Sequence, residues 1–134
     1  MKKLSMIEGI GEAFAAKLEG EGIRSIEDLL EICGSKKGRQ TLAEKTGISE
    51  KLVLKWVNRA DLFRIKGIST QYSDLLELAG VDSVPELAQR KAENLQAKMV
   101  AVNEAKKLVK KVAALSEVES WIAQAKELPK TVSH

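Results

Sequence analysis

The amino-acid sequence predicts an all-α fold built from two similar units. Apolar residues recur at helical spacing along the 134 residues, and no run alternates with period two for long enough to predict a strand. A glycine-centred turn near the start of the chain returns about sixty residues later with its apolar neighbours in register. Because every pair shares one spacing without a gap, we interpret the chain as a duplicated unit of helix, turn and helix.

The repeat joins residues of the same kind at matching positions. Glycines pair with glycines, serines with serines, and apolar residues with apolar residues. The pairs are Ile7 and Ile65, Gly9 and Gly67, Ile10 and Ile68, Phe14 and Tyr72, Leu18 and Leu76, Gly22 and Gly80, Ile23 and Val81, Ser25 and Ser83, Ile26 and Val84, and Leu29 and Leu87.

The first copy of the turn is Ile7-Glu8-Gly9-Ile10-Gly11. A short apolar helix ends near Glu8, and the next helix starts immediately after the second glycine. Glycine adopts positive φ without steric penalty and lets another backbone or a ligand approach closely. We therefore expect Ile10 to point into the core while the backbone N–H groups around it face outward.

Ile7 to Leu18 resembles a helix-hairpin-helix motif, a small DNA-binding element of repair and recombination proteins that does not read sequence. The duplicated arrangement also resembles a prokaryotic domain family of unknown function made of tandem helix-hairpin-helix-like units. The second copy departs from the motif, because Ser69 stands where glycine is expected.

The resemblance implies duplicated helix-hairpin-helix-like units packed into one compact helical domain of the SAM/helix-hairpin-helix-like class. The first repeat is expected over residues 1–62 and the second over residues 63–128. Residues 129–134 are expected to form a frayed C-terminal tail, since chain ends that nothing ties down are poorly ordered.

Start and stop signals place the helices of the first repeat. A helix over about 12–19 is followed by glycines that end it, and Ser25 caps the next helix with Asp28 in the capping-box position. The glycine-punctuated residues 34–39 predict a surface loop. A further helix follows, and Ser49 caps the last helix of this repeat.

Similar signals place the helices of the second repeat. Ser69 or Thr70 caps the helix after the second turn, and Ser83 caps the one that follows. A long helix is expected over about 92–113, and a last helix ends at Pro129.

Composition excludes several classes of protein. The single cysteine, Cys33, cannot form an intramolecular disulfide and fits a reducing cytosol, and the lone histidine, His134, makes a metal site improbable. No apolar run approaches the roughly 18 residues of a membrane span. With no catalytic triad, Cys/His pair or metal cluster, we expect a cytoplasmic protein that is not an enzyme and carries no cofactor.

The resemblance implies phosphate binding at the turns. In a helix-hairpin-helix, the amides of the turn and the positive end of the following helix dipole hold a phosphate without reading a base. The residues implied are Gly9, Ile10 and Gly11 in the first turn, and Arg64, Lys66, Gly67, Ile68, Ser69 and Thr70 in the second.

The two turns differ in charge. Glu8 and Glu12 flank the first turn and would repel a phosphate, whereas Arg64 and Lys66 flank the second. The second turn is therefore the better candidate. The alternative for both turns is that they merely join packed helices.

Two basic clusters could add phosphate contacts. The first holds lysines at i, i+1, i+4 and i+5, which would share a face of the long helix: Lys106, Lys107, Lys110 and Lys111. The second lies in the predicted loop: Lys36, Lys37 and Arg39. The alternatives are a solvated helix face and a mobile surface loop. Trp56, Trp121 and Cys33 lie on apolar faces and are expected in the core.

The sequence thus predicts non-enzymatic, sequence-tolerant binding of nucleic acid, most simply DNA, through the hairpin amides and the lysine clusters. The modest net charge of +3 leaves an alternative, a protein–protein interaction or scaffold module with the same helical fold. Convergence of the second turn with the lysine clusters would favour nucleic acid, whereas a large exposed apolar patch would favour a partner protein.

Overall fold

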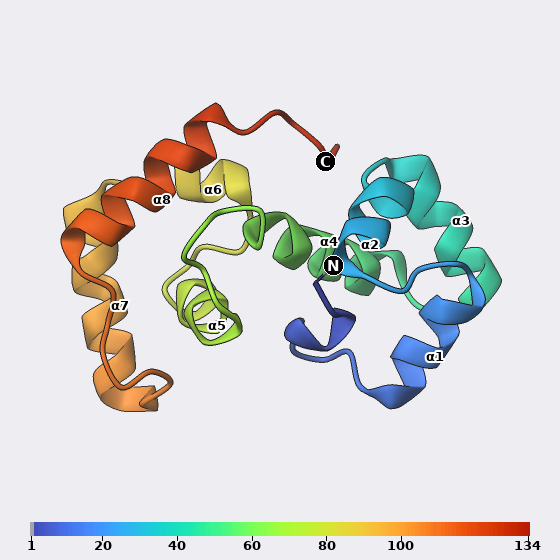
Figure 1. Cartoon of the computed structure of the whole chain (residues 1–134), viewed down its shortest axis with the longest axis horizontal. Coiled ribbons are helices and arrows are strands. Elements are labelled where there is room, and N and C mark those ends of the chain that lie inside the picture. Colours follow the sequence, from blue (N-terminus) through green and yellow to red (C-terminus); the bar gives the residue numbers. More distant parts are fainter. Residues whose placement is uncertain (1) are drawn as a thin grey trace. The chain divides into compact units, whose positions relative to one another are not determined.

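The computed structural model describes residues 2–134, whose regular secondary structure is entirely helical and includes no strand (Figure 1). The predicted all-α fold is confirmed. A 3-10 turn over Leu4–Met6 precedes eight α-helices. These are α1 (Glu12–Gly20), α2 (Ile26–Cys33), α3 (Lys36–Thr46), α4 (Glu50–Leu62), α5 (Thr70–Leu78), α6 (Val84–Ala88), α7 (Ala92–Lys106) and α8 (Leu115–Glu127). None of the helices in this part of the chain is long and apolar enough to cross a membrane.

The chain divides into two compact units. Unit 1 consists of Met1–Asp61 and Lys130–His134, and unit 2 consists of Leu62–Pro129. Unit 1 therefore contains α1 to α3 and nearly all of α4, whereas unit 2 contains α5 to α8.

Each unit has a core of aliphatic side chains around one tryptophan, as the sequence predicts. Trp56 in unit 1 and Trp121 in unit 2 are both 1% exposed. Each packs against an aromatic ring one turn into the helix that follows the glycine turn. The ring centroids are 5.0 Å apart for Phe14 and Trp56, and 5.3 Å apart for Tyr72 and Trp121. In unit 2, α8 lies along α6 and α7, which places Trp121 against α5.

Four predicted serine caps are confirmed. The hydroxyl of each serine accepts a hydrogen bond of 3.1 to 3.3 Å from the N–H three residues further on. This satisfies one of the donors that a helix start leaves without an intrahelical partner. The four caps are Ser25, Ser49, Ser69 and Ser83.

The predicted loop over residues 34–39 is wrong, because α3 starts at Lys36. Ser35 caps this helix by accepting a hydrogen bond from Gly38 N–H at 3.0 Å. Gly38 lies in the first helical turn of α3, where a Cβ would overlap the carbonyl oxygen of Ile32. The glycine therefore permits close packing of α3 on the end of α2 and does not mark a loop.

The sequence predicts a frayed C-terminal tail, but this prediction is wrong, because the tail packs within unit 1. Val132 is 2% exposed, and the N–H of Ser133 donates to the carbonyl oxygen of Gly34 at 2.9 Å. The carbonyl oxygen of Ser133 accepts a 2.5 Å hydrogen bond from Arg39. A buried apolar side chain together with these hydrogen bonds ties the tail down.

The predicted long helix over 92–113 is also shorter in the structure. It ends at Lys106, and Lys107 takes a left-handed conformation with φ of 51°. The side chain of Asn103 then pairs with both backbone groups of Val109, at 3.0 Å each, and so fixes a non-helical path. Residues 107–114 thus form an ordered connection between α7 and α8.

Cys33 provides a test of the core of unit 1. Burial raises the pKa of its thiol from 9.0 to about 11, although the Arg39 guanidinium favours the thiolate. The thiolate fraction at pH 8 is then about 100-fold lower than for a free cysteine, because each pKa unit is a factor of ten. We expect alkylation by iodoacetamide, followed by mass spectrometry, to be at least that much slower in the folded chain than in denaturant. Equal rates would place the thiol outside the core.

Candidate nucleic-acid interface

The second glycine turn leads directly into α5. Gly67 has φ of 100°, a conformation that residues with a Cβ rarely adopt. Ile68, which follows it, is 6% exposed and points into the core of unit 2. Ser69 then caps α5, so the turn, the cap and the positive end of the helix dipole lie together.

Part of the backbone of this turn is used inside the protein, against the expectation that its amides face outward. The N–H of Lys66 donates to the side-chain oxygen of Gln124 at 2.9 Å, and the N–H of Ile68 donates to the carbonyl of Ile65. Within residues 2–134, the N–H groups of Gly67, Ser69 and Gln71 have no hydrogen-bond acceptor. Three donors therefore remain for a ligand.

The start of α5 and the connection after α7 enclose a common open groove of about 800 Å³. Tyr72 joins the two walls, because its hydroxyl donates to the carbonyl oxygen of Lys111 at 2.9 Å. The lining residues are Ser69, Gln71, Tyr72, Asn103, Lys107, Leu108, Val109, Lys110 and Lys111. The groove thus brings the second turn together with three lysines of the predicted cluster.

The groove is basic. Lys107, Lys110 and Lys111 are exposed, and within residues 2–134 their ammonium groups have no ion pair. The prediction that these lysines share a face of the long helix is wrong, because α7 ends at Lys106. Lys106 is exposed on the last turn of α7 but does not line the groove.

The carboxylate of Glu117 affects the ionisation of Tyr72, which lines the groove. Burial, and then the charge of the Glu117 carboxylate, raise the pKa of the Tyr72 hydroxyl above its usual value. The Tyr72 hydroxyl therefore stays protonated at neutral pH and keeps its hydrogen bond to the chain. The carboxylate of Glu117 is itself held at the start of α8, where it accepts from Ala114 N–H at 3.1 Å.

The other basic residues of the second turn have different surroundings. Arg64 is only half-exposed and donates to the carbonyl oxygen of Pro129 at 3.1 Å, which ties it to the end of unit 2. Lys66 is exposed, and its ammonium has no ion pair among the described residues. Thr70 is the first residue of α5 and is half-exposed.

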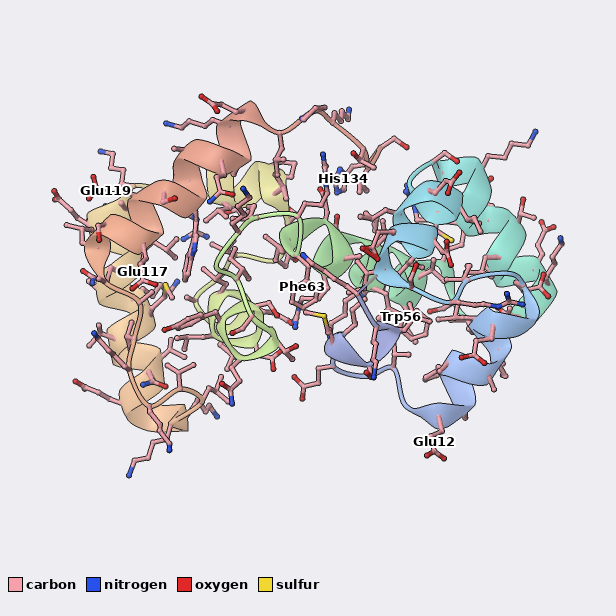
Figure 2. The ribbon with its side chains drawn as sticks, in the orientation of Figure 1. Glu12, Trp56, Phe63, Glu117, Glu119 and His134 are labelled. Atoms are coloured by element: carbon pink, nitrogen blue, oxygen red, sulfur yellow. The ribbon has the colours of Figure 1, made fainter. Side chains whose placement is uncertain are left out.

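The first turn has a similar backbone but opposite charge. Gly9 has φ of 96°, and Ile10 is buried at 7% exposure, as expected. Gly11 is the N-cap of α1 and provides no side-chain cap. Glu8 and Glu12 are exposed, and Figure 2 shows the side chain of Glu12 pointing away from the helix. This turn places acidic groups where a phosphate would bind.

The predicted cluster of Lys36, Lys37 and Arg39 belongs to unit 1 and does not line the groove. Arg39 is 4% exposed, and its guanidinium donates to the carbonyls of Cys33, Gly34 and Ser133. It therefore stabilises the tail and is not available to a phosphate. Lys36 and Lys37 are exposed on the first turn of α3.

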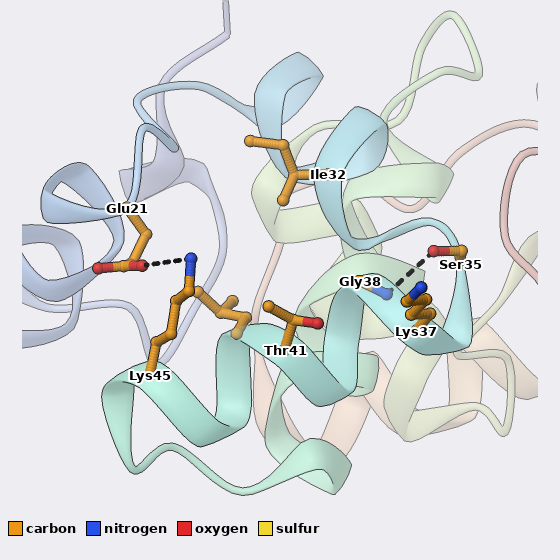
Figure 3. A pocket seen from close by; sticks show the side chains of 8 residues that line it. Glu21, Ile32, Ser35, Lys37, Gly38, Thr41 and Lys45 are labelled. Carbon is orange, nitrogen blue, oxygen red and sulfur yellow. Dashed lines mark hydrogen bonds and ion pairs between the residues drawn. The ribbon is translucent and has the colours of Figure 1, made fainter.

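Lys37 also borders a smaller hollow of about 280 Å³ in unit 1 (Figure 3). The hollow lies over α3, and its side chains are partly apolar, since Ile32 and Leu42 contribute to it. Across it, Lys45 and Glu21 form an ion pair at 3.8 Å. The paired charges leave this hollow less basic than the groove of unit 2.

Two residues that shape the interface were not expected from the sequence. Gln124 lies on α8 and bonds both backbone groups of Lys66, at 2.9 and 3.3 Å. Tyr72 is the repeat counterpart of Phe14, but its hydroxyl, which phenylalanine lacks, donates to the carbonyl oxygen of Lys111 in the connection between α7 and α8. A polar residue within an amphipathic helix carries no local signal for such a partner.

Comparison with known proteins identifies a family for which no function is described. A family model described as "Domain of unknown function (DUF4332)" matches residues 8–128. The comparisons with curated proteins and with solved structures gave no match.

Proposed function

The chain belongs to the family described as a domain of unknown function (DUF4332), and we propose from its own residues that it binds the phosphate backbone of nucleic acid. The binding is non-enzymatic and tolerant of sequence. The groove of unit 2 carries this proposal, because helix-start donors and unpaired lysines line one surface there. A buried free cysteine fits a reducing compartment, which supports a cytoplasmic location.

We also propose that the two units are duplicated helix-hairpin-helix-like units. Gly9 and Gly67 share positive φ, and so do Gly22 and Gly80. The helix after each turn closes with a similar hydrogen bond, from Ile23 N–H to Leu18 at 2.9 Å and from Val81 N–H to Leu76 at 2.8 Å. Matching backbone and aromatic contacts at matching spacing support a common origin for the two units.

The chemistry of the groove suits a phosphodiester. Backbone N–H groups at a helix start favour an anion through direct hydrogen bonds and the helix dipole. Lys107, Lys110 and Lys111 add charge that attracts successive phosphates. Because these groups contact the backbone and not base edges, they provide affinity without sequence readout. Duplex DNA is the simplest ligand of this kind.

Salt dependence tests the proposal. With four phosphates held by Lys66 and the three groove lysines, the logarithm of affinity should fall with log salt at a slope of about −3 to −4. Fluorescence anisotropy with a labelled 20-base-pair duplex of about two helical turns, at several salt concentrations, measures this slope. A slope near zero would contradict backbone binding.

A single charge reversal locates the site on unit 2. Lys66→Glu should weaken binding roughly 10-fold at about 100 mM salt and make the slope shallower by about 1, because one phosphate contact is lost. Lys98→Glu is the matched control, since the Lys98 ammonium lies near Gly80 at the opposite end of α5. Equal losses from both variants would remove the second turn from the site.

A protein partner is the second candidate. Ile32 is 40% exposed beside the hollow of Figure 3, where Leu42 adds a second apolar side chain. A chain that shows no affinity for duplex DNA even at about 50 mM salt would favour this candidate over nucleic acid.

A further inference from the structure

Trp121 keeps a polar atom without a partner at the second turn. Its side chain is 1% exposed and packs against the Tyr72 ring at a tilt of 57°, so the indole ring belongs to the core of unit 2. The indole N–H is its only hydrogen-bonding group and can only donate. Within residues 2–134, this N–H has no acceptor. Because none of the fully enclosed side-chain N or O atoms described lacks a partner, the indole N–H must reach solvent.

Gly67 is the residue that the indole N–H lies against. A Cβ built on Gly67 would lie 2.8 Å from the indole nitrogen, closer than real Cβ atoms come to their neighbours. The absence of a side chain on Gly67 thus leaves room for the indole N–H at this turn. The backbone N–H groups of Gly67 and Ser69 in the same turn also have no acceptor among the described residues. A buried, rigid donor and backbone donors therefore meet just before α5.

The first turn has the same arrangement with a different charge. The indole nitrogen of Trp56 lies 3.8 Å from the position of a Cβ on Gly9, and Figure 2 shows Trp56 among the helices of unit 1. Its N–H also has no acceptor in the described part of the chain. Because Glu8 and Glu12 are exposed beside this turn, the Trp56 site provides a matched, anion-repelling control.

We propose that the indole N–H of Trp121 donates a hydrogen bond to a phosphate oxygen bound at the Gly67 turn. This inference rests on the proposed function and adds a binding residue to it. A donor without charge held in a fixed position contributes direction, whereas the lysines contribute charge. Trp121→Phe should therefore weaken binding about 5- to 10-fold, as expected for one hydrogen bond to a charged acceptor, and leave the salt slope unchanged.

Nuclear magnetic resonance tests the inference on the unchanged chain, and a variant is needed only to assign the signals. The chain has two tryptophans, so two indole N–H signals are expected, and Trp56→Phe assigns them. On titration with unlabelled duplex DNA at low salt, the Trp121 signal should move downfield and the Trp56 signal should stay. A second titration uses inorganic phosphate at matched ionic strength.

The outcomes separate the two proposals. Movement of the Trp121 signal with DNA supports both. If DNA binding moves the backbone signals of residues 107–114 but not the indole signal of Trp121, the inference is overturned and the proposed function stands. Movement with inorganic phosphate alone supports the donor and overturns nucleic acid as its source. No response to either ligand overturns the inference, and an anisotropy titration without binding then overturns the proposed function.

Discussion

Replacing Lys107, Lys110 and Lys111 together by glutamate should lower the affinity for duplex DNA by about 100-fold or more at about 100 mM salt. Each of these lysines lines the groove of unit 2 without an ion pair among the described residues. Their loss prevents the release of the counterions that three phosphates would otherwise shed. The salt slope should become shallower by about 3, which anisotropy titrations at several salt concentrations measure.

The control for this variant has the same change in charge within the same unit. Lys91, Lys98 and Lys126 are exposed residues of unit 2 that do not line the groove, and their joint replacement by glutamate should change affinity far less. If both triple variants lose affinity equally, net charge and not the groove determines binding. If neither loses affinity, the groove is not the site.

Gly38→Ala should destabilise unit 1 by about 3 kcal/mol, because overpacking against backbone cannot be relieved by a rotamer change. A Cβ at this position would overlap the carbonyl oxygen of Ile32 and lie 3.2 Å from the hydroxyl oxygen of Ser35. Relief requires α3 to move away from the end of α2. Arg39 would move with α3 and loosen its hydrogen bonds to Gly34 and Ser133.

Urea unfolding, followed by tryptophan fluorescence, measures this effect. In a Trp121→Phe background, the remaining tryptophan is Trp56, which lies in the core of unit 1 and reports on that unit alone. Gly20→Ala is the matched control, since a Cβ there meets nothing within 4 Å at the end of α1. That variant should be neutral or more stable by about 0.5–1 kcal/mol. A Gly38→Ala chain as stable as the control would contradict the packing of α3 on α2.

Local signals predicted the helix starts well where one side chain and its own backbone decide the outcome. Ser25, Ser49 and Ser83 each cap the helix that they were expected to cap, and of the two candidates Ser69 and Thr70 it is Ser69 that caps α5. A cap depends on atoms within three residues, so the sequence contains all that is needed. The burial of Ile10 follows equally from its position between two glycines.

The errors occurred where distant residues decide the local structure. The position of the connection after Lys107 depends on the hydroxyl of Tyr72, which lies 39 residues before its acceptor. Arg39 was assigned to a phosphate site because its neighbours are basic. In the structure its guanidinium donates a hydrogen bond to the carbonyl oxygen of Ser133, which lies 94 residues away. No local pattern encodes such pairings.

The sequence by itself determined that the chain is helical, where most of its helices begin, and which apolar residues form its cores, because periodicity and caps act over a few residues. Only the tertiary structure decided that the tail is held by unit 1 and that three lysines border the start of α5. These outcomes depend on contacts between residues far apart in sequence, and such contacts form only once the helices pack.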